Sequence, residues 1–588
     1  MMEDQGSVLV LYGTETGNSQ DYAQLVAKKC QRLRIDVKVR AMDDCTLLDL
    51  VSFKVLIFVC STTGQGELPR NAKKLWKQML RRKLPPTFLF GVHFTTFGLG
   101  DSSYPRYNWA IKKIHRRVAQ LGAKELSPRG EGDEQSAEGV DENFDAWVNI
   151  VAKHLRELFP LESGVQELDE STLLDPRYTI TLLRDRLKHG PDTVKSINMT
   201  RSDVNKATIK RNDRITAQDH FQDVRHLQFE STDSDLSYVP GDTVALYPAN
   251  NWDEVDLFIK HQKLTEVADF PVEVNEEFAN AVPGGLVHPL TIRSLLLYHL
   301  DLVTIPRRSF FASVWHFASD ERERERLQEF STLEGLEDLF DYANRPRRSI
   351  LETVLEFDSL QIPVEYLLDV IPILHPRLFS IASPEDQSNA DGPLNVELAV
   401  AIVKYKTILR RIRRGVCTRW IEGLRPGDAI PFTLHKSPLA LNQELPAVLI
   451  GPGTGVAPIR SLVLTRHAQS AIGKMVLFFG CRFKDKDYIF EDDWEAPTKS
   501  GQLEVVTAFS RQNGGYVQNR LFEKRKDIGD LIVNHNASVY LCGSSGRMPR
   551  EVRITIVEIV KQALTDGDAE EYVKKMENEG RYLQETWS

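Results

Sequence analysis

The first part of the chain alternates short apolar runs with polar loops and helix-like stretches. Runs at 8–12, 55–60 and 92–97 have the length and continuous hydrophobicity of strands buried on both faces of a parallel sheet. Each run is followed by a loop rich in glycine, serine or threonine. Residues 1–158 are therefore predicted to form a doubly wound, flavodoxin-like α/β domain, whose ligand should lie at the carboxyl ends of the strands.

The pattern changes three times after residue 158. Residues 159–176 are polar and only weakly periodic, which predicts a linker. Residues 177–445 contain strand-like segments of an antiparallel barrel, interrupted from about 252 to 370 by a helix-rich insertion. From 446 to 588 the alternation of strand, loop and helix returns, and it predicts a second, nucleotide-binding α/β domain. The barrel strands are expected at 224–230, 244–247, 395–405 and 428–433.

Composition narrows the class of protein. A length of 588 residues suits three or four domains of ~150 residues. No segment approaches the ~18 apolar residues of a membrane span, and no signal peptide is visible, so we expect a cytoplasmic protein without a membrane anchor. The six cysteines form no Cys-x-x-Cys pair, so no metal site is predicted. The net charge of -9 argues against nucleic-acid binding.

The first loop, GTETGNS at 13–19, has the composition of a phosphate site. Backbone amides and hydroxyl groups can converge there on one anion, at the positive end of the following helix. A Walker loop would end in Gly-Lys-Ser/Thr, but Gly17 is followed by Asn18 and Ser19. A terminal monophosphate therefore suits this loop better than a nucleoside triphosphate. The loop alone is also compatible with an ordinary strand–turn–helix corner.

Further motifs follow in a fixed order along the chain: FGLGDSSYPRYN (97–108), RLFS (377–380), GVCT (415–418), GPGTGVAP (451–458), SRQ (510–512), YLCGSSG (540–546) and ETWS (585–588). This ordered set resembles the diflavin reductases, the family of cytochrome P450 reductase. That family joins a flavodoxin-like FMN domain to a ferredoxin–NADP reductase-like module for FAD and NADPH. The motif variants are most similar to the soluble branch that serves cytosolic iron–sulfur cluster assembly.

The resemblance implies an FMN site on three loops of the first domain. The first loop would hold the phosphate, and the others would surround the isoalloxazine ring, with Tyr104 stacked on it and Asp133 near its pyrimidine end. Thr63 stands where the family often has an aromatic residue. The implied FMN residues are Thr14, Glu15, Thr16, Gly17, Asn18, Thr62, Thr63, Gly64, Leu99, Gly100, Tyr104, Asn108 and Asp133.

The same resemblance implies the FAD and NADPH sites. FAD would be held by Arg377, Leu378, Phe379, Ser380, Gly415, Val416, Cys417, Thr418 and Trp587, and NADPH by Thr454, Arg482, Ser510, Arg511, Tyr516 and Gln518. Ser380, Cys542, Glu585 and Trp587 would form the hydride-transfer set. Two departures are visible: Glu585 replaces the family's usual aspartate, and no lysine precedes Tyr516.

The implied function is electron transfer from NADPH through FAD and FMN to an acceptor protein, of the anamorsin type in this branch. An acidic run near the FMN loops is a candidate docking patch for a basic partner. It comprises Asp101, Asp133, Glu134, Glu138, Asp141, Glu142 and Asp145. Two alternatives stay open: a diflavin reductase for a cytochrome P450, methionine synthase or a haemoprotein, and a non-catalytic flavodoxin-like scaffold.

Overall fold

The structure is a computed structural model. It describes residues 6–63, 66–104, 106–136, 139–190, 201, 203–233, 235–385, 392–408, 410–437, 444–512 and 514–587. The chain divides into two compact units, which are described separately. The first consists of Met1–Arg177, Ile305–Arg348 and Phe357–Pro363, and the second of Tyr178–Thr304, Ser349–Glu356 and Val364–Ser588.

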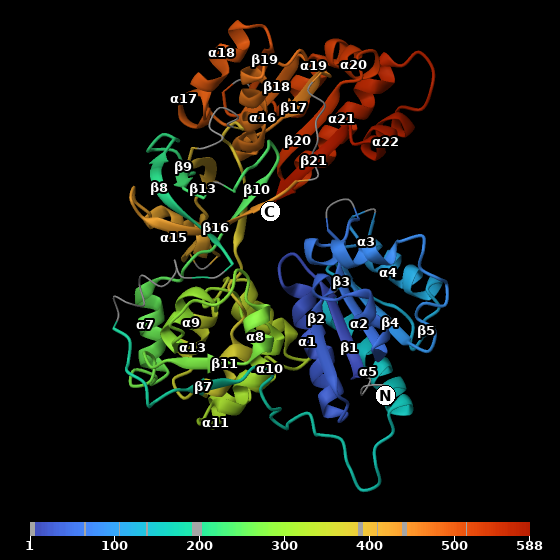
Figure 1. The fold of residues 1–588 in the computed structure, drawn as a ribbon, viewed down its shortest axis with the longest axis vertical. Coiled ribbons are helices and arrows are strands. Elements are labelled where there is room, and N and C mark those ends of the chain that lie inside the picture. The colour runs from blue at the N-terminus through green and yellow to red at the C-terminus, as the bar shows by residue number, and fades with distance from the viewer. Residues whose placement is uncertain are drawn as a thin grey trace. The chain divides into compact units, whose positions relative to one another are not determined.

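A parallel sheet forms the centre of the first unit (Figure 1). Its strand order, β2-β1-β3-β4-β5 with β6 also paired to β4, is that of a doubly wound flavodoxin-like sheet. The sequence prediction of this fold is confirmed. The strands are β1 (Gly6–Gly13), β2 (Val37–Ala41), β3 (Phe53–Ser61), β4 (His93–Gly100), β5 (Lys124–Glu125) and β6 (Gly130–Asp133).

Helices cover both faces of this sheet because its strands are apolar on both sides. Val8 and Val10 of β1 pack with helices α1 (Asn18–Arg32) and α5 (Val140–Leu158). Leu9 and Leu11 face the other way, toward α3 (Lys73–Met79) and α4 (Trp109–Gln120). A short helix, α2 (Leu47–Val51), precedes β3. The ligand loops are left at the carboxyl edge of the strands.

The predicted linker, residues 159–176, contains no helix or strand, but polar contacts attach it to the first unit. Glu170 pairs with Lys29 at 2.7 Å, and Glu167 with Arg156 at 2.6 Å. Arg32 donates to the carbonyl of Asp169. These contacts hold the segment along α1 and the end of α5.

The helical insertion is divided between the two units. Its middle part, residues 305–348, belongs to the first unit and contains α10 (Arg308–Val314), α11 (Glu321–Glu329) and α12 (Leu336–Leu339). Helix α11 carries the charge run and buries only Leu327, as expected for a solvated helix. Asp320 caps α11 by accepting from the backbone N–H groups of Arg322 and Glu323.

A six-stranded antiparallel sheet forms the barrel of the second unit, in the order β12-β10-β16-β8-β9-β13. The prediction of one strand over 395–405 was wrong, because β13 ends at Ala401 and a separate hairpin of β14 and β15 follows. The strands are β8 (Asn205–Arg214), β9 (Val224–Ser231), β10 (Thr243–Leu246), β12 (Arg377–Ser380), β13 (Leu394–Ala401), β14 (Lys404–Lys406), β15 (Ile412–Arg414) and β16 (Ala429–His435).

The rest of the insertion packs within this unit. It contains α7 (Trp252–His261), α8 (Glu276–Ala281), α9 (Ile292–Tyr298), α13 (Ile350–Glu356) and α14 (Leu367–Val370). A two-stranded sheet of β7 (Ile180–Leu182) and β11 (Val272–Val274) accompanies them. Helix α15 (Val416–Gly423) lies after β15, near the barrel.

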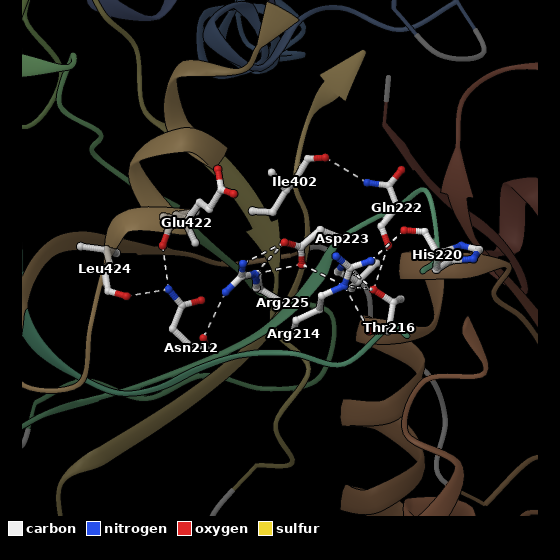
Figure 2. A network of polar contacts seen from close by, with 12 residues as sticks. Asn212, Arg214, Thr216, His220, Gln222, Asp223, Arg225, Ile402, Glu422 and Leu424 are labelled. Carbon is white, nitrogen blue, oxygen red and sulfur yellow. Dashed lines mark hydrogen bonds and ion pairs between the residues drawn. The ribbon is translucent and has the colours of Figure 1, made fainter. Parts of the chain in front are cut away.

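A polar network closes the turn between β8 and β9 (Figure 2). Asp223 accepts two charge-assisted hydrogen bonds from Arg225, at 2.8 Å from Nε and 2.8 Å from Nη2. Arg214 donates to the carbonyls of Ala217 and His220, and Gln222 donates to the carbonyl of Ile402. The contact of Gln222 ties the hairpin to the segment after β13, and Arg214 satisfies two carbonyl groups of the turn.

A second parallel sheet, β19-β18-β17-β20-β21, completes the second unit and confirms the predicted nucleotide-binding α/β fold. Its strands are β17 (Ala447–Ile450), β18 (Met475–Cys481), β19 (Leu503–Phe509), β20 (Ser538–Ser544) and β21 (Tyr582–Trp587). The helices are α16 (Val456–Ala468), α17 (Lys484–Asp487), α18 (Glu495–Lys499), α19 (Val517–Glu523), α20 (Arg525–Val533), α21 (Arg547–Ala563) and α22 (Ala569–Glu579).

Arg460 of α16 joins this sheet to the barrel through a buried charge cluster. It donates to the carbonyl of Ala382, to Glu397 of β13 at 2.8 Å and to Asp493 at 2.5 Å. His226 of β9 contacts the same Glu397 oxygen at 2.8 Å. Burial opposes ionisation of Glu397, but His226 and Arg460 outweigh it and lower its pKa to about 2.

Because the pKa of Glu397 is lower in the folded chain than its ordinary value of 4.5, its stabilising effect is full above about pH 4.5 and disappears as the pH falls toward 2. Glu397→Gln should therefore lower the free energy of unfolding at pH 7 by about 3 kcal/mol. The deficit should shrink between pH 5 and pH 3. Urea titrations at several pH values measure both effects.

The matched control is Glu495→Gln, which removes an exposed carboxylate that pairs with Lys499. This change should cost less than about 1 kcal/mol. A Glu397→Gln deficit that stays constant from pH 7 to pH 3 would contradict the role of its charge.

Candidate functional site

The loop after β1 forms a compact turn into α1. Gly17 has φ +88°, a left-handed conformation that side chains rarely adopt, and its N–H donates to Thr14 Oγ1 at 2.9 Å. The N–H of Thr14 donates to Asn71 Oδ1 at 2.8 Å. Glu15 accepts from the backbone N–H of Arg70, so its carboxylate braces the neighbouring loop. A phosphate ligand role for the Glu15 side chain is unfavourable, since two anions would repel each other.

Ser19 provides a sign that this loop fits an anion. Its side chain is fully buried in the first turn of α1, and its hydroxyl has no hydrogen-bond partner in the structure. The first turn of a helix also carries N–H groups without intrahelical partners. Ser19 was not among the predicted ligands, although it ends the GTETGNS sequence.

The second and third loops meet at the carboxyl end of β4. The N–H of Thr62 donates to the carbonyl of Leu99, and Thr62 Oγ1 accepts from Ala110. Thr63 forms an isolated antiparallel β-bridge with Glu67. Gly64 lies outside the described residues. Asn108 is fully buried and donates to Gly132, while its Oδ1 has no partner. A Cβ atom on Gly100 would come within 2.9 Å of that oxygen and 3.0 Å of the Asn108 backbone nitrogen, so glycine here allows Asn108 to pack closely against β4.

Tyr104 is 58% exposed, which leaves its ring available for stacking. Asp133 follows Gly132 in β6 and accepts from the N–H groups of Ser102 and Gln135, at 2.9 and 3.0 Å. Desolvation raises the pKa of Asp133, but these hydrogen bonds dominate and keep it below its ordinary value. Asp133 is thus an ionised carboxylate that shapes the loop carrying Tyr104.

The predicted FAD residues lie on β12 and at the start of α15. Arg377 donates to the carbonyl of His375 and leaves much of its guanidinium exposed, while Phe379 packs against the barrel core. Leu378 is exposed. Gly415 precedes α15, where Val416, Cys417 and Thr418 form the first turn. Thr418 accepts from Val403, and burial raises the pKa of Cys417 to about 12, so this thiol packs as a neutral group.

Three of the four predicted hydride-transfer residues, Ser380, Glu585 and Cys542, are neighbours, either by a hydrogen bond or as paired residues of adjacent strands. Ser380 donates to Glu585 Oε1 at 2.5 Å, although 205 positions separate them. Glu585 pairs with Cys542 in the parallel register of β20 and β21, and Trp587 pairs with Ser544 in the same ladder. Trp587 is 36% exposed. The longer side chain of Glu585 therefore reaches the FAD motif across the sheet edge.

Tyr540 is a fourth member of this cluster that sequence reasoning missed. Its hydroxyl donates to Glu585 Oε2 at 2.7 Å, so the two carboxylate oxygens bond to Ser380 and Tyr540. Burial raises the pKa values of Tyr540 and Cys542 well above normal, and the Glu585 charge acts in the same direction. Both groups stay protonated near neutral pH. The sequence feature that could have indicated Tyr540 is its place two positions before Cys542, so that both side chains lie on the same face of β20.

The glycine-rich turn after β17 fits a close approach of backbone to ligand. Thr454 lies in this turn, between Gly453 and Gly455. A Cβ atom on Gly455 would lie 2.3 Å from the carbonyl oxygen of Cys542, so the turn packs directly against the end of β20. This contact brings the turn beside the cluster of Cys542 and Glu585.

The predicted NADPH-selecting residues follow β18 and β19. The N–H of Arg511 donates to the carbonyl of Arg482, and Ser510 donates to Cys481, so the two arginines lie side by side. The Arg482 guanidinium stacks on Phe221 at 3.9 Å. Arg511 is exposed.

Tyr516 and Gln518 lie at the start of α19. Tyr516 is 60% exposed, whereas Gln518 donates to Glu551 at 2.6 Å. An open cavity of about 510 Å³ adjoins SRQ and is lined by Lys484, Asp485, Glu491, Phe509 and Gln512. Lys484 therefore places a cation near SRQ, although the chain lacks the lysine that the family often has before Tyr516.

Three family models match successive parts of the chain: Flavodoxin at 10–147, FAD binding domain at 197–420 and Oxidoreductase NAD-binding domain at 449–553. The NADPH-dependent diflavin oxidoreductase 1 of Yarrowia lipolytica is 45% identical over 99% of this chain and 89% of its own length. The chain belongs to the NADPH-dependent diflavin oxidoreductases. Proteins of the same name from Candida albicans and Saccharomyces cerevisiae are 43% and 38% identical, each over at least 99% of both chains.

As a diflavin oxidoreductase, the chain transfers electrons with FMN, FAD and NADPH as cofactors. The three matched segments contain most strands of the three large sheets, whereas β16 and β21 lie outside them. No helix in the described part of the chain is long and apolar enough to span a membrane.

Removal of the Tyr540 hydroxyl tests the cluster around Glu585. Tyr540→Phe removes one hydrogen-bond donor from the half-buried carboxylate of Glu585, which also fixes Ser380. We expect flavin reduction by NADPH to slow about tenfold, the cost of a hydrogen bond to a charged group. Single-turnover absorbance measures this.

Tyr572→Phe is the matched control, because it removes a hydroxyl that donates to Ile532 in the same sheet domain. It should leave the reduction rate unchanged. Equal slowing in both variants would show a general loss of packing and contradict a specific role of Tyr540.

Proposed function

We propose that this diflavin oxidoreductase reduces an iron–sulfur protein of the anamorsin type in the cytoplasm, in support of cytosolic iron–sulfur cluster assembly. The bound groups supply a hydride donor, a two-electron acceptor and a one-electron exit. The chain's own residues position these groups, exclude water and hold protons. The domains proposed are 1–158 for FMN, 177–445 for FAD and 446–588 for NADPH, with 159–176 as the linker.

The contact between Ser380 and Glu585 carries the catalytic part of this proposal. It joins the FAD motif to the nucleotide-binding sheet, where a hydride acceptor and donor must meet. The protonated Cys542 provides a hydrogen-bond donor there, and Glu585 fixes Ser380 by accepting the hydrogen bond of its hydroxyl. We assign Trp587, at the open end of β21, to cover the FAD ring. A scaffold without redox activity has no need of this half-buried carboxylate with two hydrogen-bond donors.

The remaining assignments follow the geometry of each loop. The backbone of 14–18 with Ser19 is proposed for the FMN phosphate, and Thr62, Thr63, Leu99, Gly100, Tyr104, Asn108 and Asp133 for the ring pocket. Arg377 through Ser380 and Gly415 through Thr418 are proposed for FAD. Thr454, Arg482, Ser510, Arg511, Tyr516 and Gln518 are proposed for NADPH.

Part of the acidic run near the FMN loops supports docking of a basic acceptor surface. Burial raises the pKa of Glu134, and repulsion from Asp101 and Asp133 raises it further, so a cation placed here would relieve that repulsion. Asp141 and Asp145 leave this candidate patch, because both pair with Arg308. Glu138 lies outside the described residues.

Reconstitution tests the acceptor. The purified chain with both flavins, supplied with NADPH, should bleach the visible absorbance of an anamorsin-type iron–sulfur protein within seconds. It should reduce a cytochrome P450, methionine synthase and a sulfite reductase haemoprotein at least tenfold more slowly. Faster reduction of any of these would favour that acceptor, and a chain that binds no flavin would contradict the redox assignment itself.

A charge reversal on the docking patch sharpens this test. Glu134→Lys should slow reduction of the iron–sulfur protein at low salt, and the difference should shrink as salt screens the charges. The control Glu571→Lys makes the same charge change on α22 and should have no effect. Flavin reduction by NADPH should be normal in both variants.

Arg511 should discriminate NADPH from NADH, because its exposed guanidinium can pair with a 2′-phosphate. Arg511→Ala should raise the Michaelis constant for NADPH about tenfold or more, and that for NADH by less than about twofold. Arg525→Ala, which removes another arginine of the same domain, should change neither constant. Equal increases for both nucleotides would reject the 2′-phosphate role.

A further inference from the structure

The lysine-free loop at 13–19 receives an arginine from a distant part of the chain, within the same compact unit. Arg307, just before α10, donates from Nη1 to the carbonyl of Gly17 at 2.9 Å. From Nη2 it donates to Asn18 Oδ1 at 2.7 Å and to the carbonyl of Thr16 at 3.3 Å. One guanidinium thus contacts three successive residues of the loop.

Neighbouring residues hold Arg307 in this place. Arg308 pairs with Asp145 at 2.8 Å and with Asp141 at 3.2 Å, both on α5. Ser309 donates to Asp21 in the first turn of α1, and Lys28 donates to Ser313 at 2.8 Å. The start of α10 is therefore docked along α1 and α5 by polar contacts that do not involve the loop itself.

Peptide geometry explains how Arg307 can act on a ligand that it need not touch. The C=O and N–H of one peptide unit point in opposite directions, because the unit is planar and trans. A guanidinium that binds the carbonyls of Thr16 and Gly17 fixes the direction of the N–H groups of Gly17 and Asn18. The Gly17 N–H in turn orients Thr14 Oγ1, and the Asn18 N–H belongs to the open first turn of α1.

The loop itself provides no cation to stabilise a dianion. A Cβ atom on Gly17 would lie 3.8 Å from both terminal nitrogens of Arg307, so the arginine charge is next to the loop backbone. Arg307 therefore brings both orientation and positive charge to a turn that has neither a lysine nor an arginine of its own.

We propose that Arg307 is a positioning residue for the FMN phosphate, which completes the loop at 13–19 from outside. This inference rests on the proposed assignment of that loop to the FMN phosphate. By linkage, a ligand that favours the oriented loop also strengthens the docking of α10 on the flavodoxin-like domain. Residues 305–348 are therefore part of the FMN site as well as of the helical insertion.

Flavin binding by the full chain tests the proposal. The chain is depleted of FMN and titrated with FMN or riboflavin, and quenching of flavin fluorescence gives both dissociation constants. Arg307→Ala should weaken FMN binding about tenfold, as expected for lost hydrogen bonds to a charged group. Binding of riboflavin, which has no phosphate, should weaken by less than about twofold in the same variant. Arg307→Lys keeps the positive charge but loses the planar set of guanidinium N–H donors. Its FMN dissociation constant should lie between those of the unmodified chain and Arg307→Ala.

Arg345→Ala is the matched control, because it removes an exposed arginine of the same unit that pairs with Asp341 and, in the described part of the chain, makes no contact with the loop or with the start of α10. Any weakening in this variant should be equal for FMN and riboflavin. The proposal is overturned if Arg307→Ala weakens both flavins equally, leaves FMN binding unchanged, or shows the same FMN-specific loss as Arg345→Ala. If the unmodified chain binds both flavins equally, the phosphate assignment fails instead.

Discussion

The buried guanidinium of Arg460 is the interaction on which the second unit depends. A charge placed between two sheets must be fully paired, and Arg460 achieves this with Glu397 and Asp493 and with the carbonyl of Ala382. Ala382 follows β12, Glu397 lies on β13, and Asp493 precedes α18. The cluster therefore helps to fix the barrel against the nucleotide-binding sheet, in the arrangement in which Ser380 at the end of β12 meets Glu585 on β21.

Periodicity predicted the parts of the fold that are governed by burial. The apolar runs of β1, β3 and β4 are hydrophobic on both faces, and helix-covered parallel strands follow from that pattern. The barrel was harder to predict, since its strands are half-exposed and its hairpin of β14 and β15 carries few apolar residues. The division of the helical insertion between two units could not be predicted from local sequence. It depends on which distant parts of the chain each helix packs against.

The candidate site shows the same limit. Motifs identified Ser380, Cys542 and Glu585, since each stands in a recognisable short sequence. They did not identify Tyr540 or Arg307, which matter through distant contacts, or Ser19, whose buried hydroxyl has no hydrogen-bond partner. Motifs suggested Glu15 and Asp133 as site residues, and the structure adds that both carboxylates accept hydrogen bonds from backbone N–H groups of neighbouring loops. A short carboxylate in a glycine-rich loop often serves the loop itself.

The 205 positions between Ser380 and Glu585 have a consequence for the order in which the molecule matures. Contacts so distant in sequence form late, because the loop that they close is entropically expensive and each side must already be structured. Until β21 has joined its sheet, Ser380 lacks the carboxylate that fixes its hydroxyl. The hydride-transfer cluster is therefore among the last parts of the second unit to be completed.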